Sequence, residues 1–551
     1  MKRVFLKTKY FLILVLFIAI FLRFWNLGSV PPSASMDEAS IGYNAYSVLK
    51  TGLDEFGQFP LISQRGYDDY RRSTYLFLVS PSVGIFGLNA FSIRLPAAVL
   101  SILTVFATYH IVLLLFTKRL PQANILALLA SFLLAISPWH IYISRLGHEA
   151  NTCLSFFIFG VLSFLLGEKR KSWILIFLSM IFFTLSMISY YSGQALIPLF
   201  VLALFFIFRK NLMYMISQNL KALLPFILLG IFLIPIFLNI FSPKSLIRFE
   251  GTSVFTSDPR RSIEYAIKRA EAIENRDYLG VLVYNRRVLM ARQGVEAYIS
   301  HFNPKWLFFN SGKEPHKVPN LGVLYLLELP FILLGALVFL KNQDIDKRLK
   351  KLLVLWFFLA PIPAALATQA PHAMRSYNFL PTWQIFSAFG IWYLFLRPVK
   401  HKLILASIFA ILSLVNVSLF YKNYFYVFPR EQSDSFHYAM SNAVSYVLKH
   451  QEDYEKIVFS NKDNLYQSYM VFLFHSKYDP LLYQKQGGTI SGGFAETHRF
   501  GKYEFRPIQS VKKEKGVLYV GNASDFNPKD KILTRFSNLN GEVRILVAEG
   551  K

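Results

Sequence analysis

The sequence predicts a polytopic α-helical membrane protein with about eleven transmembrane helices and a small C-terminal α/β domain. The chain of 551 residues is 54% hydrophobic and only 17% charged, whereas about a quarter of the residues in soluble domains are charged. Many stretches of about 18 or more residues are almost free of charge, which is the length a helix needs to cross a bilayer. The net charge of +26 comes from short basic clusters between alternate apolar runs, a pattern typical of cytoplasmic loops and not of nucleic-acid binding.

The basic clusters assign one orientation to all of the predicted spans. Lys2, Arg3, Lys7 and Lys9 precede the first apolar run, residues 10–25, so we expect a cytoplasmic N-terminus. This run also resembles a signal peptide, but we expect an uncleaved span because cleavage would detach the loop that follows from its anchor. The ten further spans are expected at residues 92–116, 124–139, 150–166, 174–189, 194–208, 223–241, 321–340, 352–368, 377–396 and 403–421.

Two long loops lie outside the cell membrane in this topology. They cover about residues 26–91 and 242–319, and within the first loop the short apolar run 75–86 is expected to be re-entrant or interfacial. The membrane-embedded domain then comprises residues 1–421. Its single cysteine, Cys153, excludes an intrachain disulfide framework.

Residues 422–551 have the composition of a soluble protein. An amphipathic helix is expected at 435–449, and strands are expected at 456–460, 516–520 and 543–548. We therefore expect a small extracytoplasmic α/β domain at the C-terminal end of this sequence.

The first external loop begins with two adjacent carboxylates. Pro31 and Pro32 end the preceding helix, and Ser35 is a suitable N-cap with Glu38 three residues on, the spacing of a capping box. Asp37 and Glu38 would then occupy the first turn of a short amphipathic helix. The spacing leaves two interpretations open: the carboxylates complement the positive end of the helix dipole, or they act on a substrate at the mouth of a membrane cavity.

Other ionisable side chains also gather at the outer boundary of the predicted spans. Charges at the edge of apolar segments are costly and suggest function by default. Arginines bind phosphate bidentately, and a carboxylate takes a proton from an acceptor hydroxyl. The structural alternatives are snorkelling of the arginines towards lipid headgroups and a capped helix start at the His–Glu pair, which is a weak metal signal because hydrolytic metals use three protein ligands. The group comprises Asp37, Glu38, Asp68, Asp69, Arg71, Arg72, Arg145, His148, Glu149, His372 and Arg375.

Five stretches appear in a characteristic order between residues 10 and 420. They are Asp37-Glu38, FSIRLP at 91–96, SPWHIYISRLGHE at 137–149, NPKWLFF at 303–309 and HAMR at 372–375. In order and topology they resemble the membrane-embedded glycosyltransferases of the GT-C class, specifically the family 39 group of protein-mannosyltransferase-like and aminoarabinose-transferase-like enzymes. Residues 422–551 lie outside this resemblance.

The resemblance implies an inverting glycosyltransferase that moves a sugar from a polyprenyl-phosphate donor to an acceptor hydroxyl on the extracytoplasmic face of the membrane. The single cysteine separately favours the plasma (inner) membrane of a bacterium or archaeon. The resemblance also implies Asp37 as the general base and Glu38 as the neighbour that orients or tunes it. His148 and Glu149 resemble a second acidic site that positions the acceptor or a divalent metal, and Arg145 is implied to bind the lipid phosphate.

The same resemblance implies further contacts and partners. Arg375 would also bind the lipid phosphate, and six residues are candidate loop contacts. No cofactor is expected with certainty; a divalent metal, if one is used, would be held by Asp37, His148 and Glu149. The expected partners are the lipid-linked donor, membrane lipids and a glycan, lipid or protein acceptor, with no nucleic acid. The candidate loop contacts are Asp68, Asp69, Arg71, Tyr284, Arg286 and His372.

Two other functions fit parts of the pattern. A multispan transporter or a flippase of a lipid-linked glycan is the main alternative, although transporters usually contain repeated halves with polar residues near mid-span. The sequence shows no internal repeat, and its polar residues gather on one face. A non-catalytic receptor that binds a glycan or peptide through residues 422–551 is the third interpretation.

Overall fold

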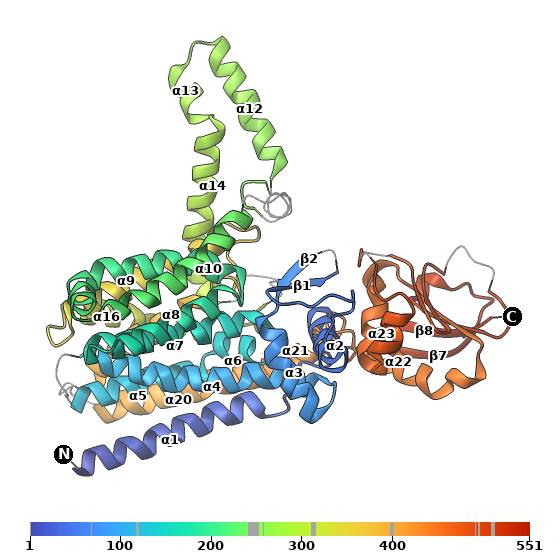
Figure 1. Cartoon of the computed structure of the whole chain (residues 1–551), viewed down its shortest axis with the longest axis horizontal. Helices are drawn as coiled ribbons and strands as arrows, with labels where there is room; N and C mark the ends of the chain where they lie inside the picture. The colour runs from blue at the N-terminus through green and yellow to red at the C-terminus, as the bar shows by residue number, and fades with distance from the viewer. Residues whose placement is uncertain are drawn as a thin grey trace. The chain divides into compact units, whose positions relative to one another are not determined.

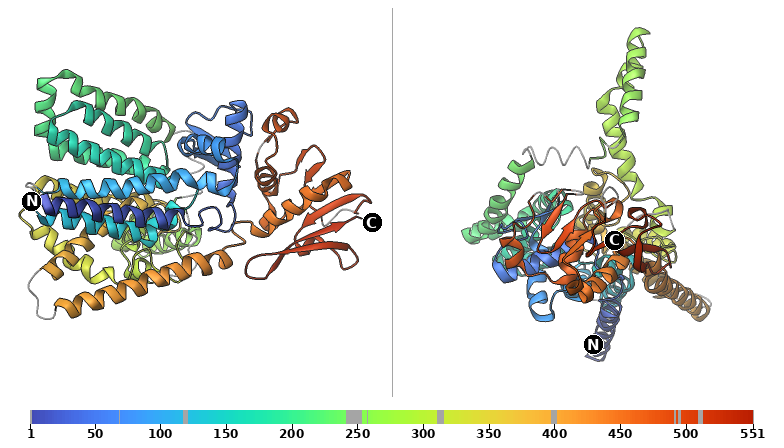
Figure 2. Two further views of the ribbon diagram at one scale, coloured as in Figure 1. Left: turned by 90° about the horizontal axis from the view of Figure 1, so that it is seen from below. Right: turned by 90° about the vertical axis from the view of Figure 1, so that its right-hand side faces the viewer.

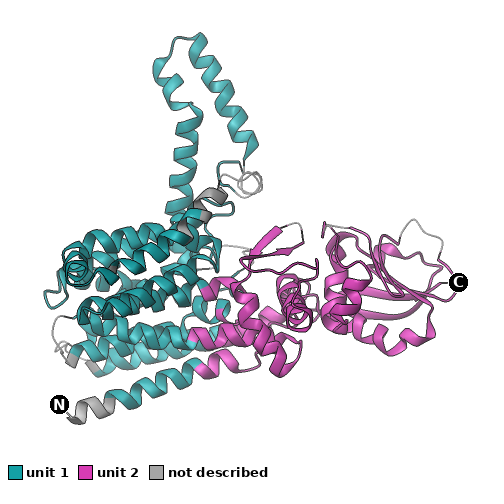
Figure 3. Ribbon diagram, in the orientation of Figure 1, with its two compact units in different colours: residues 1–19, 102–143, 153–420 teal, residues 20–101, 144–152, 421–551 magenta. Residues whose placement is uncertain are grey.

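The computed structural model describes residues 2–67, 69–116, 121–240, 253–256, 258–309, 316–396, 402–490, 492–493, 496–508 and 513–550. Within these residues the chain is mostly helical, with a six-stranded sheet and a two-stranded hairpin. It divides into two compact units that alternate along the sequence (Figure 3). Unit 1 comprises residues 1–19, 102–143 and 153–420, and unit 2 comprises residues 20–101, 144–152 and 421–551.

Unit 1 is helical, and some of its helices continue into unit 2 (Figure 3). A helix occupies each of the eleven predicted span positions, and further helices lie between the spans and in the predicted loop 242–319. The helices are α1 (Lys2–Phe24), α4 (Ala90–Leu114), α5 (Pro121–Ile136), α6 (Pro138–Ser144), α7 (Glu149–Arg170), α8 (Trp173–Met187), α9 (Tyr191–Gln218), η1 (Leu220–Leu223), α10 (Leu224–Ile240), α12 (Pro259–Glu274), α13 (Tyr278–Val283), α14 (Arg286–Ser300), α15 (Pro304–Phe308), α16 (Glu328–Lys341), α17 (Lys347–Leu359), α18 (Ile362–Ala365), η2 (Tyr377–Phe379), α19 (Thr382–Leu396) and α20 (Lys402–Lys422).

By length and composition, fewer helices than predicted could cross a membrane alone. In the described part of the chain four qualify, and a fifth does so if a pair bent by 56°, Gln122–Ile136 with Pro138–Ser144, counts as one span. Prolines explain part of the difference, because proline lacks a backbone N–H and interrupts a helix. Pro138 divides the predicted span 124–139 from the residues that follow, and Pro361 separates α17 from α18.

The predicted external loop 242–319 contains helices in its described residues. Helices α12, α13 and α14 form a hairpin that extends away from the other helices of unit 1 (Figures 1 and 2). Asp258, Asp277 and Asn285 cap these three helices by accepting hydrogen bonds from backbone N–H groups of the first turn.

Unit 2 combines the first external loop with the C-terminal residues. The predicted helix at the paired carboxylates and the predicted C-terminal helix and strands are present, as α2, α22, β3, β6 and β8. The elements are α2 (Met36–Thr51), β1 (Ser63–Gly66), β2 (Asp69–Arg72), α3 (Thr74–Phe86), the π-helical turn η3 (Asn423–Val427), α21 (Phe428–Glu431), α22 (Tyr438–His450), η4 (Gln451–Asp453), β3 (Lys456–Phe459), η5 (Asp463–Leu465), α23 (Ser468–Ser476), α24 (Pro480–Lys485), β4 (His498–Phe500), β5 (Tyr503–Phe505), β6 (Val517–Gly521), η6 (Ala523–Asp525), β7 (Lys531–Ser537) and β8 (Val543–Glu549).

The six-stranded sheet is mixed, with the order β4-β5-β3-β6-β8-β7. Its central strand β3 is parallel to β5 and to β6, while the outer pairings are antiparallel. One continuous apolar core joins this sheet and α22 and α23 to α2 and α3 of the first loop. Gly42 allows the close approach, because a Cβ there would lie 2.5 Å from Cδ1 of Ile93 and 2.9 Å from Cε2 of Phe474.

Candidate active site

The predicted capping box at the start of α2 is present. Oγ of Ser35 accepts from the backbone N–H of Glu38 at 3.2 Å, and the backbone N–H of Ser35 donates to Oε2 of Glu38 at 3.0 Å. Glu38 points inward and is 1% exposed, whereas the side chain of Asp37 is 47% exposed. Of the two adjacent carboxylates, Asp37 is therefore the one open to a substrate.

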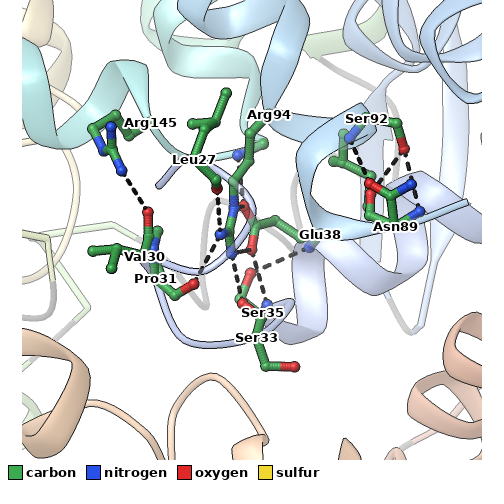
Figure 4. Close-up of polar contacts among 12 residues, drawn as sticks. Leu27, Val30, Pro31, Ser33, Ser35, Glu38, Asn89, Ser92, Arg94 and Arg145 are labelled. Atoms are coloured by element: carbon green, nitrogen blue, oxygen red, sulfur yellow. Dashed lines mark hydrogen bonds and ion pairs between the residues drawn. The ribbon is translucent and has the colours of Figure 1, made fainter. Parts of the chain in front are cut away.

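Glu38 forms a buried, bidentate ion pair with Arg94 at the start of α4 (Figure 4). The guanidinium donates from Nε to Oε1 at 2.7 Å and from Nη2 to Oε2 at 2.8 Å. Oε1 also accepts from the backbone N–H of Gly147 at 2.8 Å. Both oxygens of the carboxylate are thus occupied by partners within unit 2, which suits a residue that holds the site together.

Arg94 also fixes the turn between α1 and α2. It donates from Nη1 to the carbonyl oxygens of Leu27 at 3.1 Å and Pro31 at 2.9 Å, and from Nη2 to that of Ser33 at 2.5 Å (Figure 4). These contacts satisfy buried carbonyl groups in a segment without regular structure. The start of α2 is therefore attached to α4 by one arginine.

Arg145 has a similar bonding pattern. It donates to the carbonyl oxygens of Leu22 at 3.0 Å, Arg23 at 2.9 Å and Val30 at 2.9 Å, and its Nε donates to the hydroxyl of Tyr424 at 3.2 Å. Four of its five N–H donors are thus used within unit 2, and the side chain is fully buried. In this structure Arg145 joins the end of α1 to η3.

Asp37 is paired with Arg71 of β2. Nη2 of Arg71 donates to Oδ1 of Asp37, and the β1–β2 hairpin positions this arginine. Burial alone would lower the pKa of the Arg71 guanidinium, but the carboxylates of Asp37 and Glu149 raise the pKa above its usual value. Arg71 is therefore ion-paired with Asp37 and also feels the charge of Glu149.

His148 and Glu149 form the start of α7. Nδ1 of His148 accepts from the backbone N–H of Ala150 at 3.1 Å and lies 3.3 Å from Oε2 of Glu149. The helix start that was the structural alternative for this pair is present. It does not occupy both carboxylate oxygens of Glu149. Oε1 of Glu149 is buried and has no hydrogen-bond partner within the described residues.

The remaining candidates are placed less closely together. Asp69 lies exposed on β2 in unit 2, and Asp68 lies outside the described residues. Unit 1 contains the other four. Nη1 of Arg375 donates to the carbonyl oxygen of Thr368 at 2.6 Å. The rings of His372 and His316 are tilted by 37° with centroids 5.0 Å apart, and those of Tyr284 and Tyr265 meet edge to face with centroids 5.6 Å apart. Arg286 begins α14.

Unit 2 thus contains Asp37, Glu38, Arg71, His148 and Glu149, and sequence reasoning did not identify Arg94, the buried partner of Glu38, as a site residue. In the sequence Arg94 stands out only as part of the FSIRLP motif at 91–96. Its signal was present, because it is a charge at the beginning of an apolar span, where charges are costly.

The residues that the structure describes contain no preformed metal site. Among the residues that the structure describes, no three His, Cys, Asp or Glu side chains lie close enough together to hold a metal ion. His148 and Glu149 contact each other, and Asp37 pairs with Arg71. The divalent metal stays a prediction.

Replacing Arg71 tests its contact with Asp37. In Arg71→Gln the neighbouring positive charge is lost, so the carboxylate form of Asp37 becomes less favourable and the acid limb of the pH–rate profile should move to higher pH by about 1 unit or more. Arg71→Lys, which keeps the charge, should show a smaller shift. A pH–rate profile for the two variants and the wild type checks this; an unchanged acid limb in Arg71→Gln would separate Arg71 from the function of Asp37.

Comparison with known proteins identifies a family for part of the chain. The family model described as dolichyl-phosphate-mannose-protein mannosyltransferase matches residues 74–238. This match confirms the resemblance to GT-C membrane glycosyltransferases of the protein-mannosyltransferase type and, with it, a membrane location. No curated protein shows a significant sequence match to the chain.

Several solved structures are similar to this one. AglB, the oligosaccharyltransferase of Archaeoglobus fulgidus in complex with an inhibitory peptide and a dolichol-phosphate, is 14% identical over 85% of this chain and 63% of its own, with a TM-score of 0.49. ArnT of Cupriavidus metallidurans bound to undecaprenyl phosphate is 11% identical over 99% and 97% of the two chains, with a TM-score of 0.43. The sugar-donor-bound Pmt1–Pmt2 complex of S. cerevisiae is 17% identical over 42% and 34%, with a TM-score of 0.31. The chain thus spans less than two thirds of the length of the oligosaccharyltransferase.

Proposed function

We propose, from the protein-mannosyltransferase match of residues 74–238, that this GT-C glycosyltransferase moves a sugar from a polyprenyl-phosphate donor to an acceptor hydroxyl with inversion. The description of the matched family names a dolichyl-phosphate-linked sugar, which supports a lipid phosphate as the leaving group. The placement of the basic clusters supports a reaction on the extracytoplasmic face. The acceptor is a glycan, a lipid or a protein.

The observation that carries this proposal is the half-exposed carboxylate of Asp37 at the start of α2. It combines three properties that a general base needs: access to solvent, a fixed helix start and a cation that favours the carboxylate form. Glu38 lacks access to solvent, because Arg94 and Gly147 occupy its carboxylate oxygens. We therefore assign catalysis to Asp37 and a positioning role to Glu38.

The reaction requires one proton transfer and one displacement. Asp37 accepts the proton of the acceptor hydroxyl while the acceptor oxygen attacks the anomeric carbon from the face opposite the phosphate. The bond between the anomeric carbon and the phosphate oxygen breaks, and the lipid phosphate leaves with the electron pair. The new glycosidic bond has the inverted configuration. We retain His148 and Glu149 as the candidates that position the acceptor; Oε1 of Glu149 has no hydrogen-bond partner within the described residues.

The two arginines predicted to bind the lipid phosphate differ in this structure. The donors of Arg145 are directed to backbone carbonyls and to Tyr424, so we assign it a structural role. Arg375 has one described side-chain contact, to Thr368, and is half-buried. We retain Arg375 as the candidate for the lipid phosphate, since a guanidinium with donors to spare binds phosphate bidentately.

The proposal is tested by sugar transfer from a panel of radiolabelled polyprenyl-phosphate sugars. The purified protein is reconstituted in vesicles with an acceptor extract from the native membrane, and both the released lipid phosphate and the labelled acceptor are measured. We expect one donor to be consumed with equal amounts of the two products. Movement of a lipid-linked glycan across the vesicle membrane without transfer would instead establish the flippase alternative.

A further inference from the structure

Residues of the C-terminal segment 422–551 contact helix α2, which carries Asp37. Gly42 brings the helix against Phe474 of α23. One turn further on, Nε2 of Gln484 in α24 donates to Oγ of Ser47 at 3.1 Å and to Oγ1 of Thr51 at 3.2 Å. These contacts and the shared apolar core place α2 between the start of α4 and the C-terminal helices of the same unit.

A buried carboxylate, Glu55, lies at the centre of this contact. It is 0% exposed and forms no ion pair with any described residue. On the helix side, Nδ2 of Asn44 donates to Oε1 at 3.0 Å, and the backbone N–H of Glu55 donates to Oδ1 of Asn44 at 2.8 Å. On the C-terminal side, Oε2 accepts from Oγ1 of Thr489 at 2.8 Å and from the hydroxyl of Tyr469 at 3.2 Å.

Asn44 links this carboxylate to the candidate active site. It lies seven residues, two helical turns, after Asp37, so both residues lie on the same face of α2. At the other end of the helix, Glu38 holds the first turn to Arg94. The orientation of Asp37 is therefore determined by two anchors, of which one includes residues from beyond position 421.

We propose that residues 422–551 clamp helix α2, and that Glu55 is a positioning residue that joins the clamp to the helix through Asn44, Thr489 and Tyr469. This inference rests on the proposed function for its significance to catalysis, because it gives the C-terminal segment a role in holding the general base. The clamp itself is a structural claim that can be measured without turnover.

Protonation of Glu55 controls the strength of this clamp. Burial raises the pKa of Glu55 to about 7, against the hydrogen bonds from Asn44, Thr489 and Tyr469, which lower it. The titratable groups that face it are Asp54 on the same loop, Tyr43 on α2, Tyr67 beside the β1–β2 hairpin, and Tyr469 and Tyr483 on the C-terminal helices. Asp54 raises the pKa of Glu55 further. Burial raises the pKa of each tyrosine. The groups named here therefore include no cation that would stabilise the carboxylate form of Glu55.

The sign of the pH dependence follows from linkage. In the clamped form the carboxyl group of Glu55 keeps its proton up to about pH 7. In an opened form, in which Glu55 is exposed to water, it loses the proton near its usual pKa of 4.5. The ratio of clamped to opened protein should therefore fall by about tenfold per pH unit between these values and level off above pH 7. The clamp is strongest in acid and weakens as the pH rises.

Hydrogen exchange of residues 36–51 in the full-length protein, corrected for the intrinsic pH dependence of exchange, tests this proposal. Wild-type protein should lose protection between pH 5 and 7, and Glu55→Gln, a neutral residue of the same shape, should keep its protection across this range. Glu542→Gln, which changes an exposed carboxylate of the same unit, should behave like the wild type. Protection that does not depend on pH in the wild type, or the same dependence in Glu55→Gln, would overturn the proposal.

A second variant covers the case in which Glu55→Gln does not fold. Thr489→Val removes a hydrogen bond that favours the charged form of Glu55, so the levelling-off should move to higher pH. A shift to lower pH, or none, would contradict the network. If the wild type transfers no sugar from any donor, the proposed function fails while the exchange data still decide whether the clamp exists.

Discussion

Asp37→Asn should reduce glycosyl transfer by about 10² to 10⁴-fold, the usual contribution of a positioned general base. Asparagine has the same shape, and its side-chain oxygen can still accept from Arg71, so the start of α2 should keep its structure. The amide cannot take up the proton of the acceptor hydroxyl, and the loss should therefore appear mainly in the rate of transfer. Initial rates with a saturating lipid-linked donor measure this.

Two comparisons make the Asp37 result specific. Asp453→Asn changes an exposed carboxylate of the same unit, in the η4 turn, and should transfer sugar at close to the wild-type rate. Donor binding by Asp37→Asn, measured by displacement of a labelled lipid phosphate, should be retained. Equal transfer rates in wild type and Asp37→Asn would remove this carboxylate from the mechanism.

Arg94→Met should be the most destabilising single substitution in the candidate site. It leaves the carboxylate of Glu38 buried without its cation, and breaking a buried pair in this way costs about 3–5 kcal/mol. It also removes the donors to the carbonyl oxygens of Leu27, Pro31 and Ser33. We expect a lower unfolding temperature in detergent and loss of transfer together.

The double variant Arg94→Met with Glu38→Gln separates charge from connectivity. Neutralising Glu38 removes the buried charge, so part of the lost stability should return. Full recovery is not expected, because the three carbonyl oxygens of the preceding turn still lack a donor. If the double variant is no more stable than Arg94→Met, the isolated charge on Glu38 is not the main cost.

Much of the helical layout could be predicted because it depends on local sequence. An apolar run long enough to cross a bilayer favours a helix, because a helix satisfies every backbone polar group within the segment. A helix lies at each predicted span. The capping box at Ser35 and Glu38 was predictable for the same reason, since its partners are three residues apart. Where prediction and structure differ, as at Pro138 and Pro361, a proline within an apolar run interrupts the helix.

The roles of the charged residues in the candidate site could not be predicted in this way. The sequence does not distinguish the environments of the adjacent carboxylates Asp37 and Glu38. It suggests Arg145 as a ligand of the lipid phosphate only by resemblance to a family. Their environments depend on partners 56 residues away for Glu38 and up to 279 residues away for Arg145. Such partners become neighbours only when the chain folds, and periodicity does not report them.

By itself, therefore, the sequence determined that the chain is a helical membrane protein with a carboxylate-bearing loop, because hydrophobicity and capping act over a few residues. The tertiary structure decided which carboxylate is open and which is closed, through Arg94, Arg71 and the turn at Gly147. It also decided that α2 is held by residues such as Tyr469, which lies 414 positions from Glu55. The physical reason is burial: a charge removed from water must find its partner wherever the fold supplies one.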